Sequence, residues 1–151
     1  MAKKVAVLAV NPVNGFGLFQ YLEAFFENGI SYKVYAVAET KQIKTNSGVE
    51  LVADDIIAHL VGHEDEFDAV VFAAAIVHRK DITDEALYYR VNAQLPYEFA
   101  QKAKEEGVKR FLFLSTAAVY GVGKTLPNTM TITGDMPLAA DDLYGKSKLE
   151  G

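Results

Sequence analysis

The sequence predicts a three-layer α/β fold, in which a doubly wound, mainly parallel sheet carries helices on both faces. Three short apolar runs at residues 5–10, 32–38 and 67–75 are rich in valine and alanine, as is typical of strands buried in the middle of a sheet. Helical periodicity follows the first and the third of these runs. Strands that alternate with helices at this spacing predict parallel βαβ units.

The composition is that of a soluble globular protein and excludes several kinds of site. Of the 151 residues, 50% are hydrophobic and 23% are charged, which predicts a single domain over residues 1–151 with a core of its own. The net charge of −5 argues against a nucleic-acid partner. Because the chain has no cysteine, it has no disulfides, thiolate nucleophiles or cysteine-bound metals. No apolar run approaches the roughly 20 residues of a spanning helix, so we expect a cytoplasmic protein and no membrane partner.

The first half contains a helix and a hairpin between its strands. Apolar residues recur at helical spacing over residues 18–27, and Asn28 with Gly29 forms a helix stop. The polar stretch 39–51 contains Asn-Ser-Gly at 46–48, which predicts the turn of a small hairpin. We expect Asp54 to cap a short helix that runs to about residue 60.

The second half continues the alternation of helix and strand. A long helix is expected to begin at Asp84, and Pro96 must kink or divide it. Residues 104–107 close that helix, and residues 110–114 form a fourth strand. A loop rich in glycine, threonine and proline follows, and a final helix begins near Asp141 or Asp142.

The final helix carries a tyrosine and a lysine that could act together. Tyr144 and Lys148 are four residues apart and therefore share one helix face. A nearby ammonium favours the phenolate and lowers a phenol pKa that starts near 10, which makes tyrosine a general acid or base. Thr116 follows the fourth strand, where its hydroxyl could orient a substrate oxygen. The alternative is an ordinary surface pair, because this spacing occurs by chance in many helices.

Five separated segments make a functional role more specific. Residues 68–75, 89–92, 107–111, 115–121 and 144–148 together resemble, in order and spacing, the extended short-chain dehydrogenase/reductases, the NAD-dependent epimerase/dehydratase family. The resemblance covers residues 68–151 and implies a Rossmann-like or flavodoxin-like sandwich. It also implies NAD or NADP as cofactor and a nucleotide sugar as substrate. A homodimer, the choice of cofactor and the identity of the sugar are left open.

The same resemblance assigns roles to individual residues. It implies that Tyr144 is the catalytic acid/base, that Lys148 lowers its pKa and binds the nicotinamide ribose, and that Thr116 is the catalytic Ser/Thr. Further residues are expected to contact the cofactor: Ala74 and Ala75 through their backbone, and Asn92 from the following helix. The chain ends three residues after Lys148, before the region where this family builds its substrate pocket, so we expect an incomplete domain.

The turn after the first strand departs from the family pattern. The family places G-x-x-G-x-x-G there, because glycines allow close backbone approach to a pyrophosphate. Here only Gly15 and Gly17 are available, and Pro12 removes an amide donor. Glu39 stands at the end of the second strand, where the family has its ribose-binding acid. An intact phosphate cradle is therefore not expected.

Residues 1–74 resemble a different family, the PfpI/ThiJ class I glutamine-amidotransferase-like proteins. The resemblance rests on residues 17–25, 32–39 and 44–51. Chemistry in that family needs a cysteine and an acid near the first helix, and this chain has no cysteine and no acid in residues 11–17. We therefore expect no activity of that type. The two resemblances suggest either a fusion near residues 67–75, which could be catalytically silent, or a strongly diverged reductase.

We predict no metal site. His59 and His63 are four residues apart, with Glu64 and Asp65 beside them, which is a spacing that two ligands could use. Gly62 weakens any helix at this position, and no third ligand is evident. A solvated turn is the better interpretation.

Overall fold

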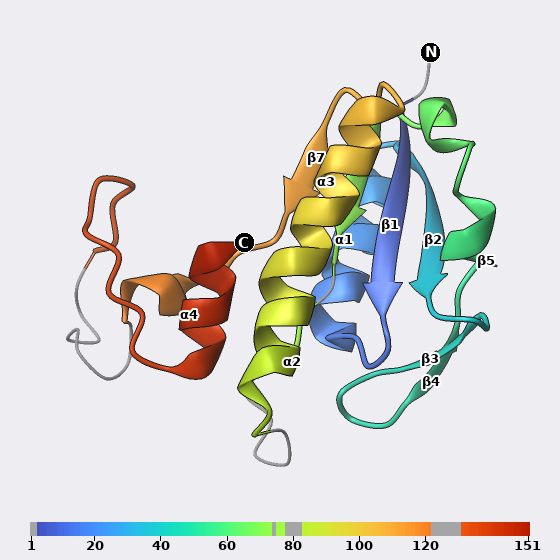
Figure 1. Ribbon diagram of the computed structural model, residues 1–151. Helices are drawn as coiled ribbons and strands as arrows, with labels where there is room; N and C mark the ends of the chain where they lie inside the picture. Colours follow the sequence, from blue (N-terminus) through green and yellow to red (C-terminus); the bar gives the residue numbers. More distant parts are fainter. Residues whose placement is uncertain (1–2, 74, 78–82, 122–130) are drawn as a thin grey trace. The chain divides into compact units, whose positions relative to one another are not determined.

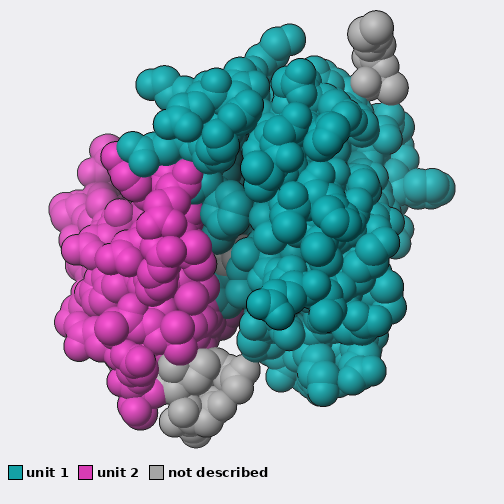
Figure 2. All heavy atoms as spheres, turned by 45° about the vertical axis from the view of Figure 1, so that its right-hand side comes forward, with its two compact units in different colours: residues 1–75, 99–114 teal, residues 76–98, 115–151 magenta. Residues whose placement is uncertain are grey.

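A computed structural model describes residues 3–73, 75–77, 83–121 and 131–151. The chain divides into two compact units, which Figure 2 shows in different colours. Unit 1 comprises residues 1–75 and 99–114, and unit 2 comprises residues 76–98 and 115–151.

Unit 1 is built on a five-stranded parallel sheet with the order β5-β2-β1-β6-β7 (Figure 1). Its strands are β1 (Lys4–Val10), β2 (Ser31–Val37), β5 (Asp55–Ile56), β6 (Ala69–Phe72) and β7 (Phe111–Phe113). In chain order the sheet therefore reads third, second, first, fourth, fifth, which is the order of the Rossmann fold. The direction of winding reverses between β1 and β6, and ligands of such sheets bind outside the carboxyl ends of the strands at that point.

Helices cover both faces of this sheet, as predicted (Figure 1). On one face, alternate residues of β1 such as Val7 pack with Leu18 of helix α1 (Gly15–Glu27) in the main core cluster. On the opposite face, Phe72 of β6 contacts Phe99 of helix α3 (Leu95–Glu105), with 5.5 Å between ring centroids. The two-residue period of the strands thus supplies apolar side chains to both layers.

The predicted hairpin is confirmed. Strands β3 (Gln42–Lys44) and β4 (Glu50–Val52) pair antiparallel and form a separate two-stranded sheet. Gly48 lies in the connecting turn with φ of +86°, a left-handed conformation that costs glycine little.

The expectation of a helix capped by Asp54 is wrong. The Asp54 carboxylate accepts the backbone N–H of Val34 at 2.7 Å instead, beside the point where β5 joins β2. The short 3₁₀ helix η1 (Ile57–His59) that follows has Ile56 at its N-cap, without a side-chain hydrogen bond. The backbone N–H of Val34 in β2 therefore takes the Asp54 carboxylate, which could otherwise have capped a helix start.

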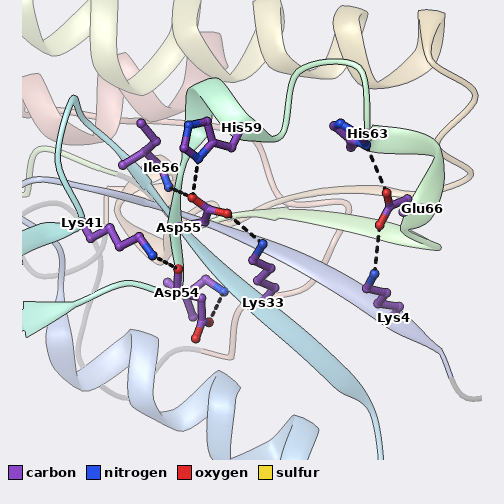
Figure 3. A network of polar contacts seen from close by, with 10 residues as sticks. Lys4, Lys33, Lys41, Asp54, Asp55, Ile56, His59, His63 and Glu66 are labelled. Carbon is purple, nitrogen blue, oxygen red and sulfur yellow. Dashed lines mark hydrogen bonds and ion pairs between the residues drawn. The ribbon is translucent and has the colours of Figure 1, made fainter.

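Carboxylates pair with basic side chains both near β5 and at the start of β1 (Figure 3). Asp55 accepts hydrogen bonds from Lys33 Nζ at 2.9 Å and from the backbone N–H of Ile56 at 2.9 Å, and it lies 2.7 Å from His59 Nδ1. In the 3₁₀ helix η2 (Glu64–Glu66), Glu66 joins Lys4 at 3.2 Å and His63 at 3.1 Å. Each of the two histidines considered as metal ligands therefore pairs with a carboxylate. Within the described ranges, no group of three or more metal-ligating side chains occurs.

We predict that Asp55→Asn makes the stability of unit 1 less dependent on pH in the acidic range. The hydrogen bond from Lys33, followed by those from His59 and Ile56, lowers the pKa of Asp55 below its usual range. A depressed carboxylate pKa stabilises the fold above the unfolded pKa of about 4 and loses that contribution as the pH falls. Urea unfolding of both proteins between neutral pH and pH ~3 measures the difference. Parallel curves for the wild type and Asp55→Asn would contradict the prediction.

Unit 2 is built from helical segments. They are α2 (Glu85–Tyr89), the π-helical segment η3 (Arg90–Gln94), the start of α3, the 3₁₀ helix η4 (Ala117–Tyr120) and α4 (Leu143–Glu150). Asp84 caps α2 by accepting the backbone N–H of Leu87 at 3.3 Å, as predicted. The π turn lies just before Pro96, so the long helix is divided where the proline removes an amide donor. Among the described residues, no helix has the length and apolar character needed to cross a membrane.

Candidate functional site

The predicted catalytic residues Tyr144, Lys148 and Thr116 all lie in unit 2. Tyr144 and Lys148 stand one turn apart on α4, which Asp142 caps by accepting the backbone N–H of Gly145 at 2.7 Å. Lys148 is 2% exposed, so it is not the solvated surface lysine of the alternative interpretation. Burial of a charged lysine is costly, so the pKa of such a side chain shifts toward the neutral form.

Thr116 connects to the tyrosine through its hydroxyl. Thr116 follows β7 in the sequence and caps η4, where its Oγ1 accepts the backbone N–H of Ala118 at 3.2 Å. The Thr116 side chain also acts on the Tyr144 phenol as a hydrogen-bonding group that lowers its pKa. Since the backbone amide occupies a lone pair of Oγ1, its single hydrogen is available for the phenol oxygen.

The electrostatics of the pair differ from the sequence-based expectation. Burial raises the pKa of Tyr144 above its usual value of 10.0, and the negative charge of Asp142 adds to the rise, while the Thr116 hydrogen bond opposes it. Burial also lowers the pKa of Lys148 from 10.5 to about 8. Desolvation disfavours both charged forms, so the resting pair is a neutral phenol beside a lysine that is only partly charged at mildly alkaline pH.

We predict that the cost of burying Lys148 falls between pH 8 and 10.5, so that unit 2 becomes more stable over this range. A lowered lysine pKa means that the unfolded chain binds more protons over this range than the folded chain does. Stability therefore increases as the pH passes the folded pKa of about 8 and levels off above the unfolded value of 10.5. Urea unfolding of the wild type and Lys148→Met tests this, with the exposed neighbour substituted as Lys146→Met for a control. A stability difference between wild type and Lys148→Met that is constant with pH would contradict it.

Asn92, expected at the cofactor, is completely buried, and its amide is fully used within unit 2. Its Oδ1 accepts the backbone N–H of Ile76 at 2.9 Å, and Nδ2 donates to the Ile76 carbonyl and to Ser147 Oγ, both at 3.0 Å. Sequence reasoning missed Ser147, although its place three residues after Tyr144 on the same helix was visible.

The other cofactor residues lie in unit 1 or outside the described residues. Gly15 is buried and Gly17 half-buried at the start of α1, Glu39 is exposed just after β2, and Ala75 is half-buried after β6. Ala74 lies outside the described residues. The three predicted catalytic residues and Asn92 therefore lie in unit 2. The predicted cofactor residues within the first 75 positions that the structure describes lie in unit 1.

The β1–α1 turn does not fit the pyrophosphate of a dinucleotide. A Cβ on Gly15 would lie 2.6 Å from Cγ2 of Thr45, so the space beside this glycine is already filled. Asn14 Oδ1 accepts the backbone N–H of Gly17 at 3.3 Å and thereby occupies an amide at the helix start.

The hairpin also holds the turn itself in place. The backbone N–H of Val13 donates to the carbonyl of Lys44 at 2.8 Å, and that of Asn46 donates to the carbonyl of Val13 at 3.0 Å. Asn11 Oδ1 accepts the backbone N–H of Lys44 at 3.0 Å. Protein groups therefore take several of the backbone and side-chain positions that a phosphate would need.

Comparison with protein-family models shows the family of the chain. The model of the NAD dependent epimerase/dehydratase family matches residues 19–151. The chain belongs to this family. The match confirms the resemblance seen at residues 68–151 and extends it toward the amino terminus. The family as a whole is described as NAD dependent, which supports a nicotinamide cofactor in general.

Curated relatives match parts of the chain. A Bacteroides thetaiotaomicron protein named ppBat is 81% identical over 73 residues, or 48% of this chain and 42% of that protein. The N-acetyl-alpha-D-glucosaminyl-diphospho-ditrans,octacis-undecaprenol 4-epimerase of Escherichia coli O157:H7 is 39% identical over 54% of this chain and 23% of its own length. A UDP-glucose 4-epimerase of Bacillus subtilis is 36% identical over 57% of this chain and 24% of its own. The chain thus spans less than half the length of each of these relatives.

Two solved structures also match parts of the chain. A crystal structure of a Bacteroides thetaiotaomicron protein is 57% identical, with a TM-score of 0.49, and the match covers 70% of this chain and 52% of the other. A DJ-1 superfamily protein of Salmonella typhimurium is 27% identical with a TM-score of 0.41, over 46% of this chain and 36% of the other.

Proposed function

We propose that unit 2 carries the acid–base centre of a nucleotide-sugar epimerase or dehydratase, in which the phenol of Tyr144 exchanges a proton with a sugar oxygen. The observation that supports this most is the burial of Lys148 one turn along α4 from Tyr144, whose phenol pKa is lowered by the side chain of Thr116. Family membership and the epimerase relatives support the substrate class.

The directions of the pKa shifts indicate whether Tyr144 starts as a proton donor or as a proton acceptor. Tyr144 is protonated at neutral pH, since an ordinary phenol pKa of 10.0 already lies well above 7 and burial raises it further. It can therefore donate that proton to a carbonyl or alkoxide oxygen of a sugar, and in the reverse direction the phenolate takes the proton of a hydroxyl. Thr116 would orient the sugar oxygen, and Lys148 would stabilise the phenolate at a pH where the lysine is charged. Because the β1–α1 turn does not fit a dinucleotide, no redox step is assigned to this chain.

A titration with a nucleotide sugar tests the proposal at the phenol itself. The chain has eight tyrosines, so ¹³Cζ-tyrosine NMR with Tyr144→Phe for assignment isolates the signal of Tyr144. We expect UDP-glucose to move this signal saturably, and UDP without the sugar to leave it in place. Thr116→Val should weaken UDP-glucose binding by about tenfold, the effect of one lost hydrogen bond. A Tyr144 signal that stays unchanged at millimolar UDP-glucose would overturn the proposal.

A second candidate is a catalytically silent α/β module, either a fusion or truncated chain or a PfpI/ThiJ-like protein without its nucleophilic cysteine. The filled β1–α1 turn favours it. A junction within residues 67–75 would fall at β6, which pairs with β1 on one side and β7 on the other, and would leave the sheet continuous. In this case, neither NADH nor UDP-glucose would bind, and no signal of Tyr144 would respond.

A further inference from the structure

Two buried polar side chains connect the helix that carries Tyr144 to the rest of unit 2. Asn92 lies on η3 and Ser147 on α4, and both are 0% exposed. They are joined by the hydrogen bond from Asn92 Nδ2 to Ser147 Oγ at 3.0 Å. A buried polar pair of this kind persists only when its remaining donors and acceptors are satisfied as well.

The hydrogen bonds around this pair allow one orientation only. Ile76 supplies an N–H to Asn92 Oδ1 and a carbonyl to Asn92 Nδ2, so turning the amide over would place like groups against each other. The second hydrogen of Nδ2 then points to Ser147, whose own hydrogen goes to the backbone carbonyl of Tyr144 at 2.9 Å. The donors therefore follow one order, from the N–H of Ile76 through Asn92 and Ser147 to the carbonyl of Tyr144.

The position of the last bond makes the serine more than a packing residue. The carbonyl of Tyr144 lies in the first turn of α4 and belongs to the residue whose phenol pKa Thr116 lowers. Gly145, the next residue, lets this turn approach η4 closely, since an added Cβ would lie 2.8 Å from the carbonyl oxygen of Ala118. A small rotation of α4 would therefore change both the phenol–hydroxyl contact and the packing of the helix.

We propose that Ser147 is a positioning residue, which fixes the first turn of α4 to Asn92 so that the Tyr144 phenol stays within hydrogen-bond reach of Thr116. It acts through the backbone of Tyr144. This inference rests on the proposed function for its purpose. The effect of Ser147 on the position of the Tyr144 phenol can be measured without a substrate.

The test is a pH titration of the Tyr144 phenol by ¹³Cζ-tyrosine NMR in the complete chain without ligand. Removing the hydroxyl in Ser147→Ala should raise the midpoint by about half a pH unit or more, the size expected when the hydrogen bond from Thr116 to the phenolate is weakened. Thr116→Val should raise the midpoint in the wild-type background and add little to Ser147→Ala, because both changes remove the same contact. Lys146→Ala, an exposed substitution on the same helix, is the matched control and should change nothing.

The other outcomes separate positioning from stability and from the proposed function. A Ser147→Ala protein that is less stable but keeps the wild-type titration of Tyr144 would overturn the inference, because the serine would then serve folding alone. Ser147→Cys keeps the volume while weakening both hydrogen bonds, and failure of both variants to fold would overturn it as well. A shifted midpoint together with no response to UDP-glucose would support the positioning role and contradict the proposed function only.

Discussion

Gly145→Ala is expected to lower the free energy of unfolding by about 2 kcal/mol, as overpacking at a tight backbone contact does. The new Cβ would lie 2.8 Å from the carbonyl oxygen of Ala118 and 3.1 Å from Asp142 Oδ1, so α4 or η4 must move. Alanine in a helix returns at most about 1 kcal/mol of this cost. The displacement should also weaken the contact between Thr116 and Tyr144. Urea unfolding with the Tyr144 titration measures both effects.

Gly134→Ala is the matched control for this prediction. No atom lies within 4 Å of a Cβ at Gly134, and the backbone there is not left-handed. Its stability should stay within about 0.5 kcal/mol of the wild type. Equal stability of Gly145→Ala and Gly134→Ala would show that α4 does not pack closely on η4.

Gly15→Ala is expected to destabilise unit 1 by about 2 kcal/mol, because it meets a side chain that is itself held in place. The added Cβ would lie 2.6 Å from Cγ2 of Thr45, which is 6% exposed. Gly17→Ala, two residues further along α1, meets nothing closer than Asn14 Nδ2 at 3.6 Å. It should be neutral or gain up to about 1 kcal/mol from its helix position.

A second substitution identifies the cause. Thr45→Ser removes Cγ2 but keeps the hydroxyl that contacts Ser47 Oγ at 2.9 Å and accepts the backbone N–H of Val49 at 3.0 Å. The double variant of Gly15→Ala and Thr45→Ser should therefore recover most of the lost stability. Chemical unfolding of the single and double variants measures this. If Gly15→Ala is as stable as Gly17→Ala, the hairpin does not fill the β1–α1 turn.

The strands and most helices could be predicted because their signals are local. Apolar runs predicted β1, β2, β6 and β7 to within a few residues, and cap residues such as Asp84 and Asp142 marked helix starts. The two-residue strand β5 was missed because it exists only through pairing with β2. Asp54 was misassigned for the same reason, since its partner is a backbone amide twenty positions away.

The placement of the candidate site residues could be predicted from the sequence, but the direction of their pKa shifts could not. The spacing of Tyr144 and Lys148 placed them on one helix face, and the order of five separated segments that include them and Thr116 indicated the family. The direction of the tyrosine pKa depends on how deeply the pair is buried, which no local pattern reveals. The role of Thr45 beside Gly15 likewise depends on how a hairpin docks onto a turn about thirty residues earlier in the chain. The prediction of a single domain over residues 1–151 stays a prediction.

We propose that the chain carries the acid–base half of an epimerase-type site, while its β1–α1 turn has no room for a dinucleotide. Titration with NADH and NADPH, followed by nicotinamide fluorescence, tests this most directly. We expect no saturable change in nicotinamide fluorescence up to millimolar cofactor, and we expect Gly17→Ala to behave like the wild type. Saturable binding of NADH that ADP-ribose competes away would contradict it, because the pyrophosphate would then have a place that Thr45 and Asn14 now fill.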